Sequence, residues 1–389
     1  MEQTLQHSLA PIFRPLFASK YRQFKTALAI GLMTLILSTP RLHMMNEYVH
    51  SDSGLWTVII RKSKSLTDPL KDIPQASHAA KKKLRLTVPF IAGVLHLNAW
   101  GIYFIQFILG FFSIFFFLAL ADRIIDNHLH TFLLTASFAF IFAGKCAFVD
   151  ISGHLDAWPI FFALAALFTR YRLLQLLFLF AVIWSDERGY ILAFFTSIAL
   201  FMFDNFNRGS DEQKLKINYK ALLSMLSIPL AAVLRFYLTK YFDLGTNYMD
   251  PANDVGLDLF FKQIEQRFFI SALMQFEGFW ILFLTASIYM YKRKMYYAFC
   301  LFTGSILINT FSSFIVGDII RSASYGFPLI FISLICLREI NKQLMDILIV
   351  LVFVVSFIIP PFQFLGDQIS YYSPLPFHHI YYFRQFMPI

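Results

Sequence analysis

A long succession of apolar runs, separated by short polar connections, constrains this chain more than any other feature of its sequence. The runs cover residues 25–44, 84–97, 100–121, 131–149, 157–168, 173–184, 191–203, 221–238, 268–290, 298–316, 325–337 and 347–360. In lipid every backbone polar group must be satisfied inside the protein, and a helix does this within its own segment. The pattern predicts an all-α, polytopic transmembrane helical bundle of about 10 to 11 helices, each needing about 20 residues to cross.

The composition agrees with a chain that folds in a bilayer. Hydrophobic residues make up 58% of the chain and charged residues 15%, whereas a soluble domain has about 25% charged residues. The net charge of +9 does not indicate nucleic acid, because most Lys and Arg lie in short loops between apolar runs, as membrane proteins place them. We therefore expect the lipid bilayer, and no nucleic acid, as a partner.

Several runs are too short to cross a membrane unaided, among them residues 157–168 and 173–184, since a span needs about 20 residues. Such runs must borrow polar neighbours or form broken helices that line a cavity. No repeat or glycine-rich linker is evident, so residues 1–389 are expected to form a single membrane domain. The cysteines lie inside apolar runs and are expected to be buried thiols, not a disulfide framework: Cys146, Cys300 and Cys336.

The distribution of Lys and Arg predicts a cytoplasmic N-terminus and an outer C-terminus, because the segments then assigned to the cytoplasm hold most of the basic residues. No cleavage site follows the first run, which is expected to be a retained helix. The outer side would hold a first loop at 45–85, a second loop at 239–267 and a tail at 361–389. The basic residues at 81–85 and the short run 84–97 fit an interfacial helix that meets anionic head groups. The basic first loop itself favours the opposite orientation.

In the preferred orientation, four clusters of ionisable residues gather at the outer ends of the helices. They contain Glu47 and Asp52; Asp150, His154 and Asp156; Asp186, Glu187 and Arg188; and Asp318, Arg321 and Tyr325. Charged residues at membrane depth are costly and tend to be functional, so we expect a polar cavity that opens outward. Lys145, about one turn before Asp150, is a further candidate, either as a ligand of a lipid-linked phosphate or as a partner of Asp150.

Each cluster also has a purely structural interpretation, and for the cluster of Glu47 and Asp52 it is a solvated loop with ordinary polar residues. Asp156 immediately precedes a predicted helix and suits an N-cap. Residues 186–188 could form a salt-bridged turn, and Asp318 could neutralise Arg321 three residues later. The two carboxylates and the histidine at 150–156 could instead hold a divalent cation; no other cofactor is expected.

In this order, the four clusters resemble those of the GT-C superfamily of membrane glycosyltransferases. Members of that superfamily have many transmembrane helices, an acidic motif in the first outer loop and an interfacial helix after it. Glu47 and Asp52 stand in the position of the acidic motif, and residues 81–97 in that of the interfacial helix. The resemblance extends over most of the chain in layout. Many members have adjacent acidic residues where Glu47 and Asp52 are separated, and some carry a large C-terminal domain that is absent here.

The resemblance implies transfer of a sugar from a polyprenyl-phosphate-linked donor to an acceptor at the outer face of a bacterial inner membrane. Asp52 would deprotonate the acceptor hydroxyl, with Glu47 and Asp156 as the other carboxylate candidates. Arg188, Arg321 or Lys145 would stabilise the leaving phosphate, and the remaining cluster residues would bind substrate.

Three other functions stay open. The first is a polymerase or ligase of surface polysaccharide, and the second is a transporter or flippase for a lipid-linked glycan. A transporter is expected to show matching broken helices in two halves, and the sequence gives no sign of them. The third is a structural membrane subunit without chemistry, which would not need four ionisable clusters on one face.

Overall fold

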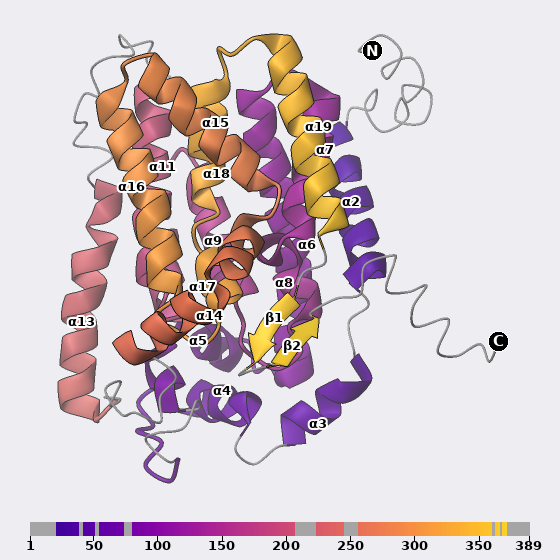
Figure 1. Cartoon of the computed structure of the whole chain (residues 1–389). Coiled ribbons are helices and arrows are strands. Elements are labelled where there is room, and N and C mark those ends of the chain that lie inside the picture. The colour runs from indigo at the N-terminus through magenta and orange to yellow at the C-terminus, as the bar shows by residue number, and fades with distance from the viewer. Residues whose placement is uncertain are drawn as a thin grey trace.

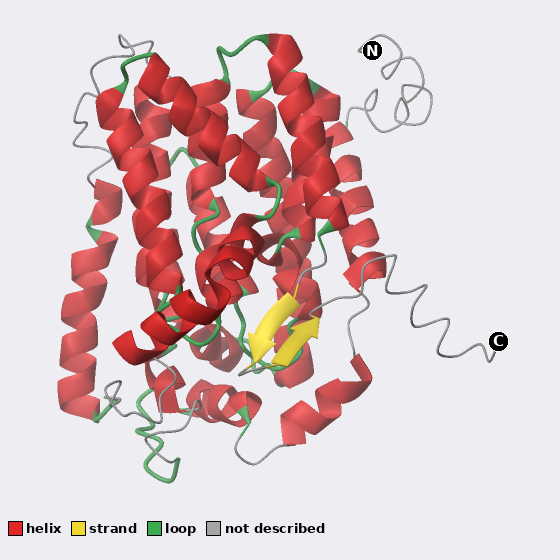
Figure 2. Ribbon diagram, in the orientation of Figure 1, coloured by secondary structure: helices red, strands yellow, loops and turns green. Residues whose placement is uncertain are grey.

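The computed structural model describes residues 21–38, 42–50, 54–73, 80–206, 223–244, 256–359, 362–365 and 368–371. These residues are helical apart from one short β hairpin, as Figure 2 shows. Strands β1 (Phe362–Leu365) and β2 (Gln368–Tyr371) pair in antiparallel register, with Phe362 opposite Tyr371. The hairpin lies in the expected tail at 361–389, so the prediction of an all-α fold is correct for the body of the chain and wrong for this segment.

The helices follow the apolar runs of the sequence closely. They are α2 (Arg22–Ser38), α3 (Met45–His50), α4 (Leu55–Lys64), α5 (Thr87–Val94), α6 (Ala99–Ile124), α7 (His128–Phe140), α8 (Phe142–Val149), α9 (Ala157–Phe168), α10 (Arg172–Ser185), α11 (Gly189–Phe206), α13 (Ser227–Phe242), α14 (Leu257–Phe276), α15 (Phe279–Lys292), α16 (Tyr296–Ser313), α17 (Ile319–Ser324), α18 (Pro328–Leu337) and α19 (Lys342–Ile358), with the short 3-10 helices η1 (Leu42–Met44) and η2 (Ala80–Leu84).

Two helical segments among the described residues are long and apolar enough to cross a membrane, namely Ala99–Ile124 and Leu223–Phe242. Two further pairs of helices pass the same test together but are sharply bent where they meet, so up to four spans fulfil these criteria of length and composition. The chain therefore has apolar helices that could cross a membrane. The number of spans expected from the sequence, about 10 to 11, stays a prediction.

The two bent pairs show that runs 131–149 and 268–290 are each two helices. Helices α7 and α8 meet at an angle of 58° around Ile141, and α14 and α15 meet at 88° around Glu277 and Gly278. The first break lies within apolar sequence, where hydrophobicity gives no sign of it, whereas a charged residue and a glycine mark the second. Broken helices were expected among the short runs, and these two occur instead within longer ones.

The centre of the helical body is packed with aromatic rings around α6. Phe117 of α6 stacks on Phe138 of α7 with ring centroids 4.2 Å apart, and Phe331 of α18 lies 4.9 Å from Phe117 on centroids. Cys146 and Cys336 are buried as expected, but Cys300 is exposed on the outer surface of α16. An apolar run thus predicts a helix without telling which of its faces turns inward.

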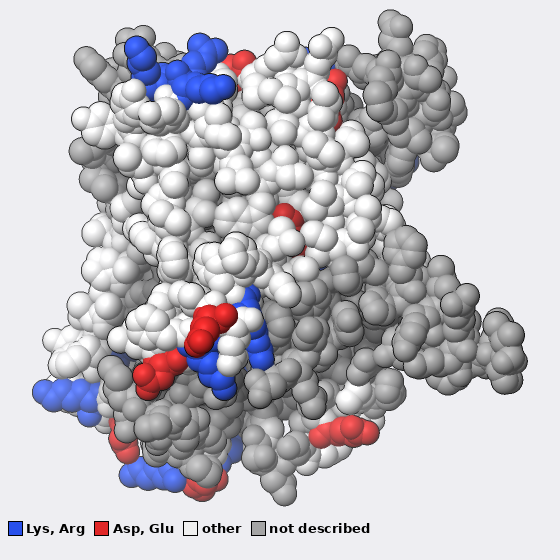
Figure 3. Space-filling model, in the orientation of Figure 1, with Lys and Arg blue, Asp and Glu red and all other residues white. Residues whose placement is uncertain are grey.

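The expected outer loop at 45–85 contains helices of its own, and these lie together with α5 at the lower end of the molecule in Figure 1. Helix α4 buries Trp56, Val58 and Ile59 and ends in a basic turn, so it is amphipathic. Figure 3 shows that charged side chains on the visible face gather toward the two ends, with a largely uncharged band between them. An interfacial helix was expected near residues 84–97, and α5 occupies that run. Its position at a membrane surface stays a prediction, and α4 is a further amphipathic helix beside it.

Candidate functional site

Asp156 lies at the centre of a buried charge network. It occupies the N-cap position of α9, as its structural interpretation proposed, but its side chain makes no capping bond. Its carboxylate accepts hydrogen bonds from Arg188 Nη2 at 2.8 Å, from Arg321 Nε at 2.7 Å and from the Tyr325 hydroxyl at 2.9 Å. The side chain is fully buried, and these three donors replace the water that it has lost.

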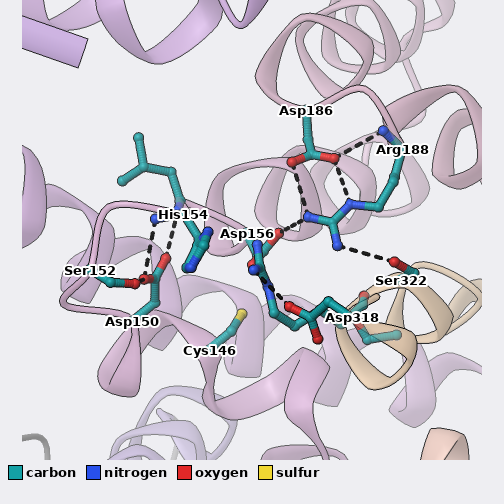
Figure 4. A network of polar contacts seen from close by, with 12 residues as sticks. Cys146, Asp150, Ser152, His154, Asp156, Asp186, Arg188, Asp318 and Ser322 are labelled. Atoms are coloured by element: carbon teal, nitrogen blue, oxygen red, sulfur yellow. Dashed lines mark hydrogen bonds and ion pairs between the residues drawn. The ribbon is translucent and has the colours of Figure 1, made fainter. Parts of the chain in front are cut away.

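Arg188 connects the turn between α10 and α11 to the rest of the network. Its Nε and Nη2 atoms donate to the two carboxylate oxygens of Asp186, at 2.8 and 3.1 Å, and Nη1 donates to Ser322 Oγ at 3.3 Å. Figure 4 shows the guanidinium between Asp186 and Asp156. The turn is salt-bridged, as its structural interpretation proposed, but it also reaches two other segments of the chain.

Arg85, at the end of η2, extends the network toward the first loop. It forms an ion pair with Asp186 at 2.8 Å and donates to Glu187 Oε2 from Nη2 at 2.6 Å. The basic residues at 81–85 were expected to meet lipid head groups, so the pairing of Arg85 with Asp186 and Glu187 was not predicted. The sequence does contain a sign of it: the turn at 186–188 has two acidic residues and one arginine, so one carboxylate needs a cation from elsewhere.

The fourth cluster enters the network through the short helix α17. Arg321 donates to Asp318 Oδ2 at 2.8 Å as well as to Asp156, and the Arg188 guanidinium lies over the Tyr325 ring, 4.9 Å from its centroid. Asp318 and Arg321 do neutralise each other, as one interpretation held. Even so, Arg321 and Tyr325 join residues that are far apart in sequence.

The charges in the network shift one another's pKa values. Burial alone would raise the pKa of Asp156, but the opposite charges of Arg321 and Arg188 outweigh it and hold the pKa below its ordinary value. Burial is likewise opposed by Arg188 and Arg85 at Asp186, whose pKa is lowered. A carboxylate held ionised by two arginines is a weak base, so Asp156 is better suited to position arginines than to abstract a proton.

The loop from Asp150 to Leu155 is built around its own first residue. The Asp150 carboxylate accepts bonds from Ser152 Oγ and from the backbone N–H groups of His154 and Leu155. Gly153 has φ +88°, a left-handed conformation that favours glycine. Within the described part of the chain, no group of three His, Cys, Asp or Glu side chains is placed to hold a metal ion.

A small cavity adjoins the network beneath α4. It is lined by Val58, Ile59, Lys62, Lys82, Arg85, Val88, Pro89, Gly153, His154, Leu155 and Ser185. It contains about 280 Å³ of empty space, including its open mouth. Arg85 belongs to both the cavity and the network, so the two are contiguous.

The remaining predicted site residues lie away from the network or are not described. Glu47 is exposed on α3, and Asp52 lies outside the described residues. Lys145 of α8 is buried and donates to the Phe140 carbonyl at 2.7 Å, next to the break that ends α7. Its electrostatic partner is Glu277 at the α14–α15 bend, not Asp150.

The structure thus brings together members of three of the four predicted clusters and adds Arg85 to them. No family model, no curated protein and no solved structure matches this chain.

Proposed function

We propose that this protein is a membrane glycosyltransferase that transfers a sugar from a polyprenyl-phosphate-linked donor to an acceptor at the outer face of a bacterial inner membrane. One observation carries the proposal: a buried network of acidic and basic side chains adjoins a cavity with cationic groups, at the end of an apolar helical body. Burying so many charges is costly unless they are paired, and a phosphate substrate needs cations that are held in place.

The reaction requires few groups. The acceptor oxygen forms a bond to the anomeric carbon while the bond from that carbon to the phosphate oxygen breaks. The phosphate leaves with the electron pair, and a carboxylate takes the acceptor proton. Asp52 is the proposed base and Glu47 the other candidate, because the two arginines that hold Asp156 ionised make it a weak base. The network holds Arg85, Arg188 and Arg321 in fixed positions from which their field stabilises the phosphate as its charge develops.

The test is transfer from a radiolabelled polyprenyl-phosphate sugar by purified protein in lipid nanodiscs, with a panel of sugars and lipid extracts as acceptors. Asp52→Asn is expected to abolish transfer while thermal unfolding stays unchanged. Asp126→Asn, which removes an exposed carboxylate outside the four clusters, serves as the matched control and is expected to retain activity. Full activity of a folded Asp52→Asn protein would remove Asp52 from the mechanism, and no transfer with any donor would contradict the proposal.

The two bent helix pairs favour a transporter or flippase as the second candidate, because discontinuous helices line the substrate sites of many transporters. Reconstituted protein that moves a fluorescent lipid-linked glycan across liposomes, without bond cleavage, would support that function over transfer. Polymerisation or ligation of surface polysaccharide would instead lengthen or relocate a glycan in the same transfer assay.

A further inference from the structure

The cavity beneath α4 is lined by three basic side chains and by no carboxylate of the described residues. Its polar lining comes from Lys62, Lys82 and Arg85, together with His154 and Ser185. Arg85 is already paired with Asp186 and Glu187. The two lysines are therefore the cations that remain for a ligand.

Both lysines are buried, with Lys62 0% and Lys82 2% exposed. Lys62 Nζ donates to the Leu66 carbonyl at 2.9 Å, and Lys82 Nζ donates to the Gly153 carbonyl at 2.6 Å. An ammonium group has three N–H donors, and these contacts engage one on each side chain. No described carboxylate lies within ion-pair distance of either nitrogen, so a buried charge on each lysine lacks a counterion in contact.

The surroundings make an anion favourable at this place. Burial lowers the pKa of Lys62 to about 8, against the attraction of Asp68 and with repulsion from Lys83. Burial also lowers the pKa of Lys82, and the repulsion of Arg85 exceeds the attraction of Asp150. An anion in the cavity that both lysines line would offset the repulsion on each, and charge-assisted hydrogen bonds are stronger than the present bonds to carbonyls.

The cavity has little free space between its lining side chains. To admit an anion, the two lysine side chains would move away from the Leu66 and Gly153 carbonyls, and their long, flexible stems allow this movement. Gly153 also lines the cavity, and its backbone packs closely against α4, since a Cβ there would lie 3.2 Å from the Trp56 ring.

We propose that this cavity binds a phosphate group, with Lys62 and Lys82 as its direct ligands and Arg85 as the link to the buried network. The phosphate could belong to a lipid head group such as an isoprenyl phosphate, or to free phosphate. In the proposed glycosyltransferase it would be the phosphate of the donor, and in that respect the inference rests on the proposed function. Binding itself requires no transfer.

The experiment measures binding of farnesyl phosphate and of inorganic phosphate by isothermal titration calorimetry. The protein is the full chain in nanodiscs of phosphatidylcholine, which carry no competing net negative charge. The test variant is Lys62→Met/Lys82→Met, and the matched control is Lys64→Met, which removes an exposed lysine from the same helix. Circular dichroism and size-exclusion chromatography check the fold, and single Lys62→Gln replaces the double variant if it does not fold.

We expect binding of farnesyl phosphate to weaken about tenfold or more per lysine lost, because charge-assisted bonds are lost, and to be unchanged in Lys64→Met. That result supports a site for a lipid-linked phosphate. Inorganic phosphate that binds as tightly and depends on the same lysines supports a site for free phosphate. Absence of binding by both probes, or binding that folded variants leave unchanged, overturns the site. Phosphate binding without sugar transfer would refute the proposed function alone.

Discussion

Among single residues, Asp156 is under the strongest physical constraint. It is fully buried and depends on Arg188, Arg321 and Tyr325 for its solvation. Asp156→Asn would leave the buried guanidinium of Arg321 and the half-buried one of Arg188 without a shared counterion, and breaking a buried pair costs about 3–5 kcal/mol. We expect that loss in the free energy of unfolding, measured by denaturant titration in detergent.

The control for Asp156→Asn is Asp68→Asn, whose partner Arg61 lies nearer the solvent. An ion pair of that kind contributes under about 1 kcal/mol. The pH dependence gives a second check. Because folding lowers the pKa of Asp156, its contribution is present above the ordinary value of about 3.9 and is lost as the pH falls through the folded value. Equal losses in the two variants, or a difference that disappears already at neutral pH, would be inconsistent with the network.

Lys62 predicts a second pH effect, at higher pH, in which the charged form of the side chain opposes folding. Folding lowers its pKa from 10.5 to about 8, so the unfolded chain binds the proton more tightly and the charged lysine disfavours folding. That penalty is complete below about pH 8 and is relieved as the pH rises toward 10.5. The free energy of unfolding of the wild type is expected to rise relative to Lys62→Met across that window. Parallel pH profiles for the two proteins would mean that Lys62 is not buried as described.

Among the helical elements, the 88° bend between α14 and α15 places Gly278 close against α19. A Cβ at this position would lie 2.3 Å from the Val352 carbonyl oxygen of α19, which has no room to retreat within a packed helix. We expect Gly278→Ala to destabilise the protein by about 1–3 kcal/mol, as overpacking does, and thermal unfolding measures it.

Gly304→Ala is the matched control, since nothing lies within 4 Å of a Cβ built on Gly304 in α16. In a helix interior, alanine is favoured over glycine by about 0.5–1 kcal/mol. The two substitutions should therefore act in opposite directions. A Gly278→Ala protein as stable as the wild type would show that α19 does not pack against the bend.

The extent to which the sequence predicted the elements depends on where their ends fall. The run 157–168 matches α9 because Asp156 and Thr169 bound it with polar residues. The break at Ile141 has apolar residues on both sides, so hydrophobic pattern alone could not reveal it. Helix α4 was missed because only one of its faces is apolar and its last turn is basic.

The candidate site was predictable to a similar degree. The residues that meet at Asp156 could be identified from the sequence. They lie in three turns that interrupt apolar runs, and charges in such places must either pair with one another or stay in contact with water. Their pairing could not be predicted, since it depends on which helix ends adjoin. Arg85 escaped for that reason: its partners lie in the turn at 186–187.

For the whole molecule, the apolar helices and the uncharged band of Figure 3 predict stable insertion in a membrane. We expect the protein to remain in the membrane pellet after alkaline carbonate extraction and to be released by detergent. Reporter fusions at the two ends are expected to show a cytoplasmic N-terminus and an outer C-terminus. Release by carbonate would contradict membrane insertion, and reversed reporter signals would contradict the orientation alone.

The electrostatic pairing of Lys145 with Glu277 has a consequence for biogenesis. The ribosome synthesises α8 long before α14, so with α7 and α8 as a span, as predicted, the lysine would enter the bilayer before its acidic partner exists. A lone charge at that depth is unfavourable, so we expect the early helices to stay near the insertion machinery or its chaperones until the later ones arrive. Assembly of this protein is then completed only when its second broken helix joins the first.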